Sequence, residues 1–200
     1  RWLLEEMRDF HDAVAEALDS GRVTRDLFAH GIEAILGVDV VRKHAPRARR
    51  HAELCLLYEW TRRQRRLMAE RLAPFGMEVR GDAGWQGAAG AANGQLDYFD
   101  ELAGFYIRTA VNLNITSLQM KSAVNQRVFD CPAAGGFLLT DAQSDIAELF
   151  DKDEVATYAT LEELADKVRF YQAHPAERRI ITRRARRRVL AQHTHKDRLR

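Results

Sequence analysis

The sequence has little cysteine and no long apolar run. Its two cysteines, Cys55 and Cys131, stand far apart among 200 residues, which makes a poor disulfide framework and predicts a reduced, cytoplasmic setting. No apolar run approaches the ~20 residues of a membrane span. The first residues, 1–4, lead into an acidic amphipathic segment and not into a signal peptide. The chain also begins without methionine, which indicates a fragment or a processed product.

Two common kinds of catalytic motif are also missing. No Gly-x-Ser-x-Gly elbow occurs, so a serine nucleophile of that type is not expected. His193 and His195 are two positions apart, but no cysteine or acid nearby has the spacing of a further metal ligand. The sequence therefore predicts no metal site.

The charge is nearly balanced along most of the chain. Thirty-one basic and 29 acidic residues leave a net charge of +2, which gives the whole molecule no strong attraction to nucleic acid or membranes. The arginine run 178–188 is interleaved with Ile181, Ala185 and Val189 at helical spacing, which predicts an amphipathic helix with a basic, solvated face. No aromatic residues interleave with the run, as a single-strand binder would need. Nucleic acid is not an expected partner, although this tail leaves a basic nucleic-acid binder as the weakest alternative.

The first 75 residues have the pattern of helices. Apolar residues recur at helical spacing over 2–18 and stop at Ser20-Gly21. A second helix is predicted between a cap at Thr24 and an end at Gly37. Residues 47–72 predict one long helix with a basic face. Residues 1–75 are therefore expected to form a helical segment that packs on the following domain.

From residue 76 the pattern changes to short strands that alternate with helices. Strands are predicted at 77–80, 110–116, 137–140 and 155–158, and helices at 98–108, 122–133, 145–150, 161–173 and from Pro175 onward. Thr160 and Glu163 form a capping box before one of these helices. Strands separated by helices imply parallel pairing through right-handed crossovers. The predicted fold class is α/β, a Rossmann-like three-layer domain with a small parallel sheet at residues 76–200.

Polar groups flank the predicted strand 137–140. This strand rises from Gly135-Gly136 and stops at Asp141. The polar groups are Asn125, Arg127 and Asp130 before it, and Asp145 and Glu148 after it. Ligands of open α/β sheets bind at the carboxyl ends of strands, so this stretch predicts a binding site.

Several motifs in this half follow one another in a familiar order. They are Val111-Asn112-Leu113-Asn114-Ile115-Thr116-Ser117, Asn125-Gln126-Arg127-Val128-Phe129-Asp130, Gly135-Gly136-Phe137-Leu138-Leu139-Thr140-Asp141 and His174-Pro175-Ala176-Glu177-Arg178-Arg179. Together they resemble the donor-binding C-terminal domain of GT-B glycosyltransferases. The closest resemblance is to the bacterial "glycosyl transferases group 1" set that includes CgeB-like spore-maturation proteins. The resemblance covers residues 78–200.

The resemblance implies half of an enzyme with two Rossmann-like domains. A nucleoside-diphosphate sugar would bind this half, and the unknown acceptor would bind an N-terminal GT-B domain that this chain does not contain. Transfer would need no metal, because helix dipoles and basic side chains stabilise the leaving diphosphate. No cofactor is implied, since the nucleotide sugar is a substrate. The catalytic base would lie in the missing domain, so the catalytic residues are unknown and the chain alone is expected to be inactive.

The resemblance assigns donor-binding roles to particular residues. Arg127 would bind the diphosphate through its bidentate fork, or it pairs with Asp130 on the surface. Asp130 would accept a ribose hydroxyl, or it is an ordinary helix carboxylate. The pair Gly135-Gly136 would let backbone approach the ligand, or it makes a tight turn. Asn125 completes this group.

Further candidates come from the neighbouring segments. The sugar side would be lined by Asn112, Asn114, Ser117 and Glu148. For Asn112 and Asn114, which share one strand face, a buried hydrogen-bond network is the alternative, and for Glu148 a solvated acid. The base side would involve Gly81, Asp82 and Trp85, where Trp85 stacks on the base or covers the core.

One departure from the family pattern bears on function. Many retaining members carry two glutamates separated by seven residues. Here Asp130 takes the second position and Ser122 falls near the first. The sugar, the base and the stereochemical outcome therefore stay open. The missing acid favours an alternative function, a non-catalytic Rossmann-like module for assembly or regulation.

Overall fold

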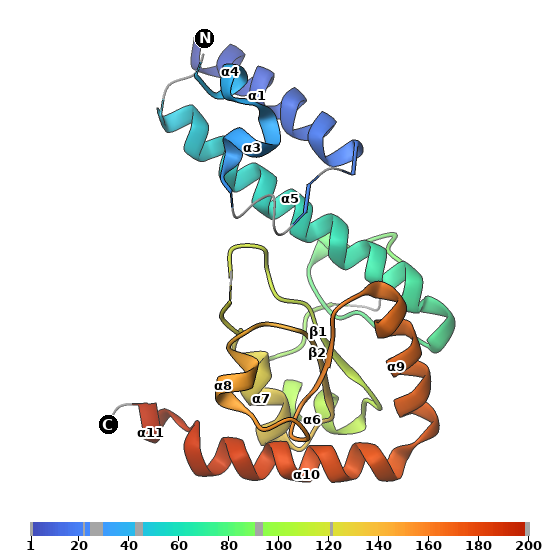
Figure 1. Ribbon diagram of the computed structural model, residues 1–200. Helices are drawn as coiled ribbons and strands as arrows, with labels where there is room; N and C mark the ends of the chain where they lie inside the picture. The colour runs from blue at the N-terminus through green and yellow to red at the C-terminus, as the bar shows by residue number, and fades with distance from the viewer. Residues whose placement is uncertain are drawn as a thin grey trace. The chain divides into compact units, whose positions relative to one another are not determined.

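The structure, a computed structural model, describes residues 2–21, 23–24, 30–42, 46–90, 94–120 and 122–198 (Figure 1). Contacts between residues divide the chain into two compact units. Unit 1 comprises Arg1–Arg65 and Ser117–Lys121, and unit 2 comprises Arg66–Thr116 and Ser122–Arg200. Helix α5 (Pro46–Leu72) contributes residues to both units, whereas the sequence places a division after residue 75.

Unit 1 is helical. It contains α1 (Trp2–Asp19), α3 (Ile32–Leu36), α4 (Val38–Arg42) and the first part of α5. Its core consists of Val14, Ala17, Leu18, Val23, Ile32, Ile35, Val41, Ala52 and Leu56. The predicted helix ends at Ser20-Gly21 and Gly37 are confirmed. The beginning of the second predicted helix, at 25–29, lies outside the described residues.

Unit 2 is built on a parallel sheet of three strands. These are β1 (Asn112–Asn114), β2 (Leu138–Asp141) and β3 (Ala156–Tyr158), in the order β1-β2-β3. Asn112 pairs with Leu138, and Leu139 pairs with Ala156. The predicted α/β class, with a small parallel sheet of Rossmann-like type, is confirmed.

Helices cover both faces of this sheet (Figure 1). They are α6 (Leu102–Arg108), α7 (Arg127–Ala134), α8 (Ile146–Leu149), α9 (Leu161–Ala173) and α10 (Pro175–Gln192), and α11 (His195–Arg198) follows beyond the end of α10. Successive strand residues point to opposite faces. Leu138 therefore packs in the cluster formed with α6, α7 and α10, and Leu139 packs in the cluster formed with α9. The sheet is the middle layer between these two cores.

The predicted starts of two helices are confirmed in atomic detail. The N–H of Glu163 donates to Thr160 Oγ1 at 3.2 Å, and the Glu163 carboxylate accepts from the N–H of Ala159 at 2.6 Å. These bonds satisfy donors that the first turn of α9 would otherwise leave open. Pro175 occupies the first turn of α10, where its missing N–H costs nothing.

Three predicted elements differ from the structure. The strand at 77–80 is wrong: among the residues described in this segment only Val79 bridges, its N–H donating to Gly90 O at 2.8 Å. The helix at 122–133 begins only at Arg127, because Asn125 turns its side chain to Asn114. The helix at 98–108 begins at Leu102, since the Asp97 carboxylate binds backbone N–H groups of a preceding turn.

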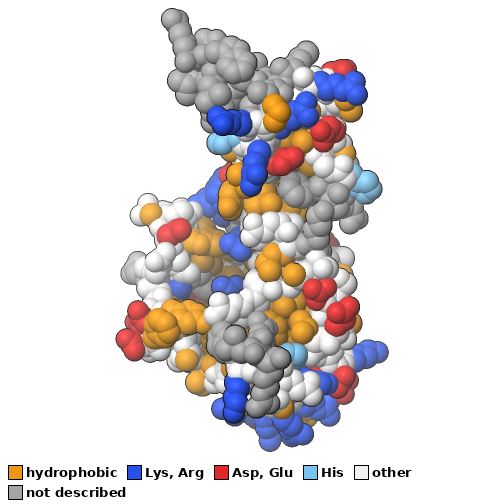
Figure 2. All heavy atoms as spheres, turned by 90° about the vertical axis from the view of Figure 1, so that its left-hand side faces the viewer, with side chains coloured by type: hydrophobic (Ala, Val, Ile, Leu, Met, Phe, Trp, Pro, Cys, Tyr) orange, Lys and Arg blue, Asp and Glu red, His pale blue; other side chains and the backbone are white. Residues whose placement is uncertain are grey.

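Helix α10 has the basic outer face that the sequence predicts. Ala185 and Val189 are buried, while Figure 2 shows Lys and Arg side chains gathered at the lower end, where α10 lies in Figure 1. Part of this charge is neutralised locally, since Arg184 pairs with Asp153 at 2.7 Å and Arg188 pairs with Glu154 at 2.7 Å. Among the described helices, none has the length and apolar character needed to cross a membrane.

We expect Leu139→Ala to lower the free energy of unfolding by about 2–5 kcal/mol, because a fully buried leucine leaves a cavity. Urea unfolding followed by circular dichroism measures this change. Leu190→Ala is the matched control: Leu190 is 48% exposed, and its loss should stay within about 0.5 kcal/mol. Equal losses in the two variants would contradict the assignment of Leu139 to the core.

Candidate functional site

Asn114 organises the carboxyl end of β1. Its side chain is fully buried. The amide Nδ2 donates to Thr140 Oγ1 at 3.0 Å, and Oδ1 accepts from Asn125 Nδ2 at 2.9 Å and from Arg127 Nη1 at 3.3 Å. Its backbone carbonyl accepts from the Tyr158 hydroxyl at 3.0 Å. One asparagine therefore connects all three strands with the segment that enters α7.

Asp141 has the corresponding position at the end of β2. Its Oδ1 accepts from the Thr116 N–H at 3.0 Å and from Thr116 Oγ1 at 2.7 Å, and its Oδ2 accepts from Gln143 Nε2 at 2.7 Å. The carboxylate thereby fixes the two chain segments that leave β1 and β2. Thr116, Thr140, Asp141 and Gln143 were not among the predicted site residues. Their position in the sequence could have identified them, because each lies at or just beyond the end of an apolar strand.

Arg127 lies at the first turn of α7, next to the end of β1. Its side chain is exposed, and its Nη1 donates to Asn114 Oδ1 at 3.3 Å. Burial raises the pKa of the nearby Tyr106 phenol, and the positive charge of Arg127 and a side-chain hydrogen bond with it oppose that rise. In the part of the chain described, no ion pair joins Arg127 to Asp130. The guanidinium therefore presents donors to solvent at the carboxyl edge of the sheet.

Asn125 lies beside Arg127, and one of its two side-chain polar atoms has no hydrogen-bond partner. Its Nδ2 donates to Asn114, but its Oδ1 is buried and has no hydrogen-bond partner. A buried acceptor without a partner costs about 1–3 kcal/mol. This oxygen is an unfilled hydrogen-bonding position in the cluster.

Asp130 binds a tyrosine, and not Arg127 as one of the two alternatives had it. The Tyr98 hydroxyl donates to Asp130 Oδ2 at 2.7 Å and accepts from Gln126 Nε2 at 2.5 Å. The bond to the Asp130 carboxylate raises the pKa of Tyr98, because losing the phenol proton would place two negative charges together. The polar group at the start of α7 thus continues outward from Arg127 to Asp130 and Tyr98.

Gly135 and Gly136 lie at the opposite edge of the sheet, because they precede β2. Gly135 ends α7 with a φ of 96°, a left-handed conformation. A Cβ on Gly136 would lie 2.8 Å from Cys131 Sγ and 2.9 Å from the Tyr106 carbonyl oxygen, so only glycine fits. The tight turn and close packing explain this pair without a ligand, and its predicted role in donor binding stays a prediction.

A hollow of about 420 Å³ lies at this amino edge. Gly135 and Phe137 line it together with four arginines, Arg108, Arg178, Arg179 and Arg183. Of the predicted site residues, only Gly135 contributes to this hollow. This hollow and the polar cluster around Asn114 therefore lie at different edges of the same sheet.

Asn112 also lies toward the amino edge, as the first residue of β1. It is buried, and its Nδ2 donates to the carbonyls of Tyr106 at 2.9 Å and Phe137 at 3.1 Å. Its Oδ1 has no hydrogen-bond partner. The side chains of Asn112 and Asn114 are thus both buried and hydrogen-bonded within the protein, each to its own partners, and their contact with a donor stays a prediction.

The predicted base-side residues form a separate loop. Arg66 Nη2 donates to the carbonyls of Gly84 at 2.7 Å and Gln86 at 3.0 Å, and the Asp82 carboxylate accepts from the Gly84 N–H at 2.9 Å. Gly81 lies directly against Trp85, where a Cβ would meet the ring at 2.5 Å. In the chain as described, the hydrogen bonds of this loop do not reach Asn114.

The last two predicted residues are Ser117 and Glu148. Ser117 belongs to unit 1 by its contacts. Glu148 is exposed on the short helix α8. The structure thus brings Asn114, Asn125 and Arg127 together, with Asp130 three residues further along α7.

A parallel sheet covered by helices on both faces, with a polar cluster at its carboxyl edge, defines a Rossmann-like domain of the kind that binds ligands at that edge. Residues 39–200 match the family described as Glycosyl transferase-like. The chain belongs to this family, and the prediction of a glycosyltransferase domain is confirmed at that level. Searches among curated proteins and among solved structures found no match.

We expect Asp130→Asn to lower the pKa of Tyr98 toward its ordinary value, because the variant removes the carboxylate that receives the phenol hydrogen bond. Ultraviolet absorption of the phenolate during an alkaline titration measures this shift. Subtracting the titration of the matching Tyr98→Phe protein isolates the signal of Tyr98.

Asp166→Asn is the control for this titration, since Asp166 is exposed on α9 and pairs with Arg169 at 3.0 Å. It should leave the Tyr98 titration unchanged. If Tyr98 ionises at the same pH with aspartate and with asparagine at position 130, the hydrogen bond between them is absent in solution.

Proposed function

We propose that unit 2 binds the nucleoside-diphosphate sugar of a metal-independent glycosyltransferase of GT-B type. In this proposal the chain is the C-terminal, donor-binding region of a CgeB-like enzyme, and an N-terminal domain supplies the acceptor site and the catalytic base. Membership in the Glycosyl transferase-like family supports glycosyl transfer. The main support for a donor site here is the exposed guanidinium of Arg127, which is hydrogen-bonded to Asn114 at the carboxyl edge of the sheet.

Arg127 would bind the diphosphate. Guanidinium groups present N–H pairs that match two phosphate oxygens. The first turn of α7 adds a partial positive charge at the same place, because helix dipoles are positive at the amino end. Both contributions grow in importance as the sugar leaves and the diphosphate takes up negative charge, so no metal ion is needed for that stabilisation.

Asp130 and Asn125 would bind hydroxyl groups of the donor. Both offer acceptor oxygens beside Arg127, and the Oδ1 of Asn125 has no protein partner. The Asp130 carboxylate is shared with Tyr98, so a ribose hydroxyl would use its second oxygen or displace the phenol. Asn114 would act by positioning, since its own polar atoms are bound within the protein.

A second candidate is a non-catalytic Rossmann-like module for assembly or regulation. The bonds among Thr116, Thr140, Asp141 and Gln143 favour it, because these strand-end groups bind each other and could serve stability alone. The serine near the position of the first family glutamate, Ser122, favours it as well. Nucleotide binding separates the two candidates.

We expect the chain to bind one of UDP, GDP or TDP, with the same affinity with and without magnesium ions. Arg127→Ala should weaken this binding by about 1.5–3 kcal/mol, the contribution of a charge-assisted hydrogen bond, which is about 10- to 150-fold in Kd. Isothermal titration calorimetry measures both effects.

Arg179→Ala is the matched control, since Arg179 is an exposed arginine of the same unit at the amino edge of the sheet. Its affinity for the nucleotide should equal that of the parent chain. Equal affinity for Arg127→Ala and the parent would remove Arg127 from the site. Absence of binding at millimolar nucleotide would favour the non-catalytic module.

A further inference from the structure

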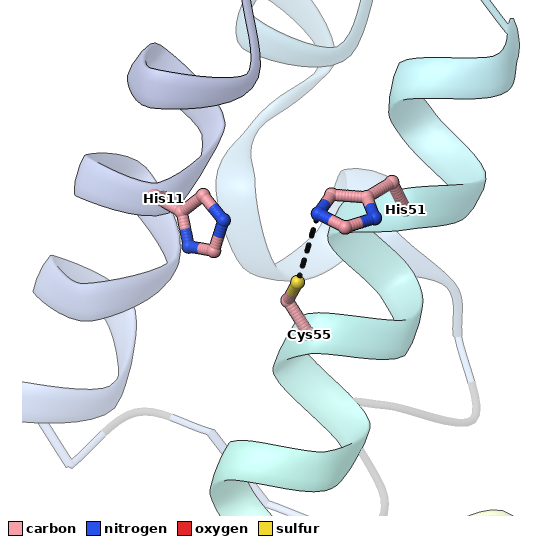
Figure 3. Close-up of side chains that lie close together, drawn as sticks. All are labelled: His11, His51 and Cys55. Carbon is pink, nitrogen blue, oxygen red and sulfur yellow. Dashed lines mark hydrogen bonds between the residues drawn. The ribbon is translucent and has the colours of Figure 1, made fainter. Parts of the chain in front are cut away.

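Three metal-ligand side chains meet in unit 1. Figure 3 shows His11 of α1 pointing toward His51 and Cys55 of α5. The ligand atoms of the three residues lie within 4.8 Å of one another. Cys55 Sγ and His51 Nε2 form a hydrogen bond at 3.3 Å, and the rings of His11 and His51 meet edge to face at 5.7 Å between centroids.

The geometry of a single helix explains why two of these three side chains lie close together, but not why the third does. His51 and Cys55 are four residues apart, so they share one face of α5 and would meet on any helix. His11 is forty positions earlier and arrives from another helix. The convergence of a third nitrogen ligand on this pair is therefore a property of the fold of unit 1.

The surroundings of the cluster are apolar on one side and open on the other. Val14 lies about one turn from His11 on α1, and Ala52 and Leu56 are next to His51 and Cys55 on α5; all three are buried in the core of unit 1. His51 and Cys55 are half-buried, whereas His11 is exposed. Packing thus restrains the two α5 ligands, while an ion has access from the side of His11.

We propose that His11, His51 and Cys55 bind a zinc ion. Zinc accepts two imidazole nitrogens and one thiolate in a tetrahedral arrangement, whereas magnesium and calcium prefer oxygen ligands. Bond lengths of about 2.0–2.1 Å to nitrogen and 2.3 Å to sulfur place tetrahedral ligand atoms about 3.3–3.6 Å apart. The His51–Cys55 pair, at 3.3 Å, is within a few tenths of an ångström of the nitrogen–sulfur separation, and rotation of the exposed His11 side chain brings in the third ligand.

The zinc ion would connect α1 with α5. With three protein ligands, a fourth position faces solvent and holds water or a ligand from outside the chain. Because the ion binds the folded arrangement of both helices, its binding free energy adds to the stability of unit 1. This role is independent of the donor site proposed for unit 2.

The test uses the full 200-residue chain without a histidine tag, reduced and freed of metal with a chelator. Calorimetric titration with zinc should show one ion bound per chain. His11→Ala, His51→Ala and Cys55→Ser should each weaken zinc binding about tenfold or more, because even the loss of an outer-shell partner costs a metal site about 10–100-fold. Cobalt substitution should give a thiolate-to-metal absorption band that Cys55→Ser abolishes.

His174→Ala is the matched control, since His174 is an exposed histidine of unit 2 whose ring stacks on Phe170. It should bind zinc as the parent chain does. Circular dichroism checks that each variant is folded, and the exposed position of His11 makes its variant the least disruptive. Absence of saturable zinc binding, or equal affinity in the parent and the three ligand variants, would overturn the proposal.

A thiol reagent gives an independent measurement on the unmodified sequence. Cys131 is fully buried, and burial raises its pKa to about 12, so the folded chain reacts through Cys55. Zinc should protect Cys55 from the reagent, and His11→Ala should remove that protection. Equal reaction rates with zinc and with magnesium would contradict a metal–thiolate bond at Cys55.

Discussion

The parallel hydrogen bonding of β1, β2 and β3 determines which polar side chains of unit 2 can meet. Residues that follow β1 and β2, such as Thr116 and Gln143, gather at one edge, and residues that precede them gather at the other. Helix α7 runs between the two edges. Its first turn therefore brings Arg127 to Asn114, while its end places Gly135 at the opposite edge, by the arginine-lined hollow.

The buried amide of Asn114 links this sheet to its functional edge. A buried polar group is costly unless it is bound, and here the donor and the acceptor of the amide both have partners. A buried amide whose donor and acceptor are both bound is held rigidly in a low-dielectric interior. That rigidity fixes the position of an exposed guanidinium, which would otherwise lose conformational entropy on binding a ligand.

Helix α5 contributes different kinds of side chain to the two units. Its first part carries the nitrogen and sulfur ligands His51 and Cys55, and its last turns contribute Arg66, Met68 and Leu72 to unit 2. The family match begins at residue 39, so it includes all of α5 and excludes His11. Soft ligands in unit 1 and hydrogen-bonding groups in unit 2 are suited to different partners, a metal ion and an anionic nucleotide.

The sequence by itself determined the class of fold and most element positions, because apolar periodicity and capping groups are local. It placed α9 at residues 161–173 and the start of α10 at Pro175, and it implied the parallel sheet. It grouped Gly135 with Arg127, although the two lie at opposite edges of the sheet, and it offered only His193 and His195 as metal ligands, because His11 and His51 are distant along the chain. Only the tertiary structure shows which residues are neighbours in these two places, because the contacts join residues that are far apart in the sequence and share no local pattern.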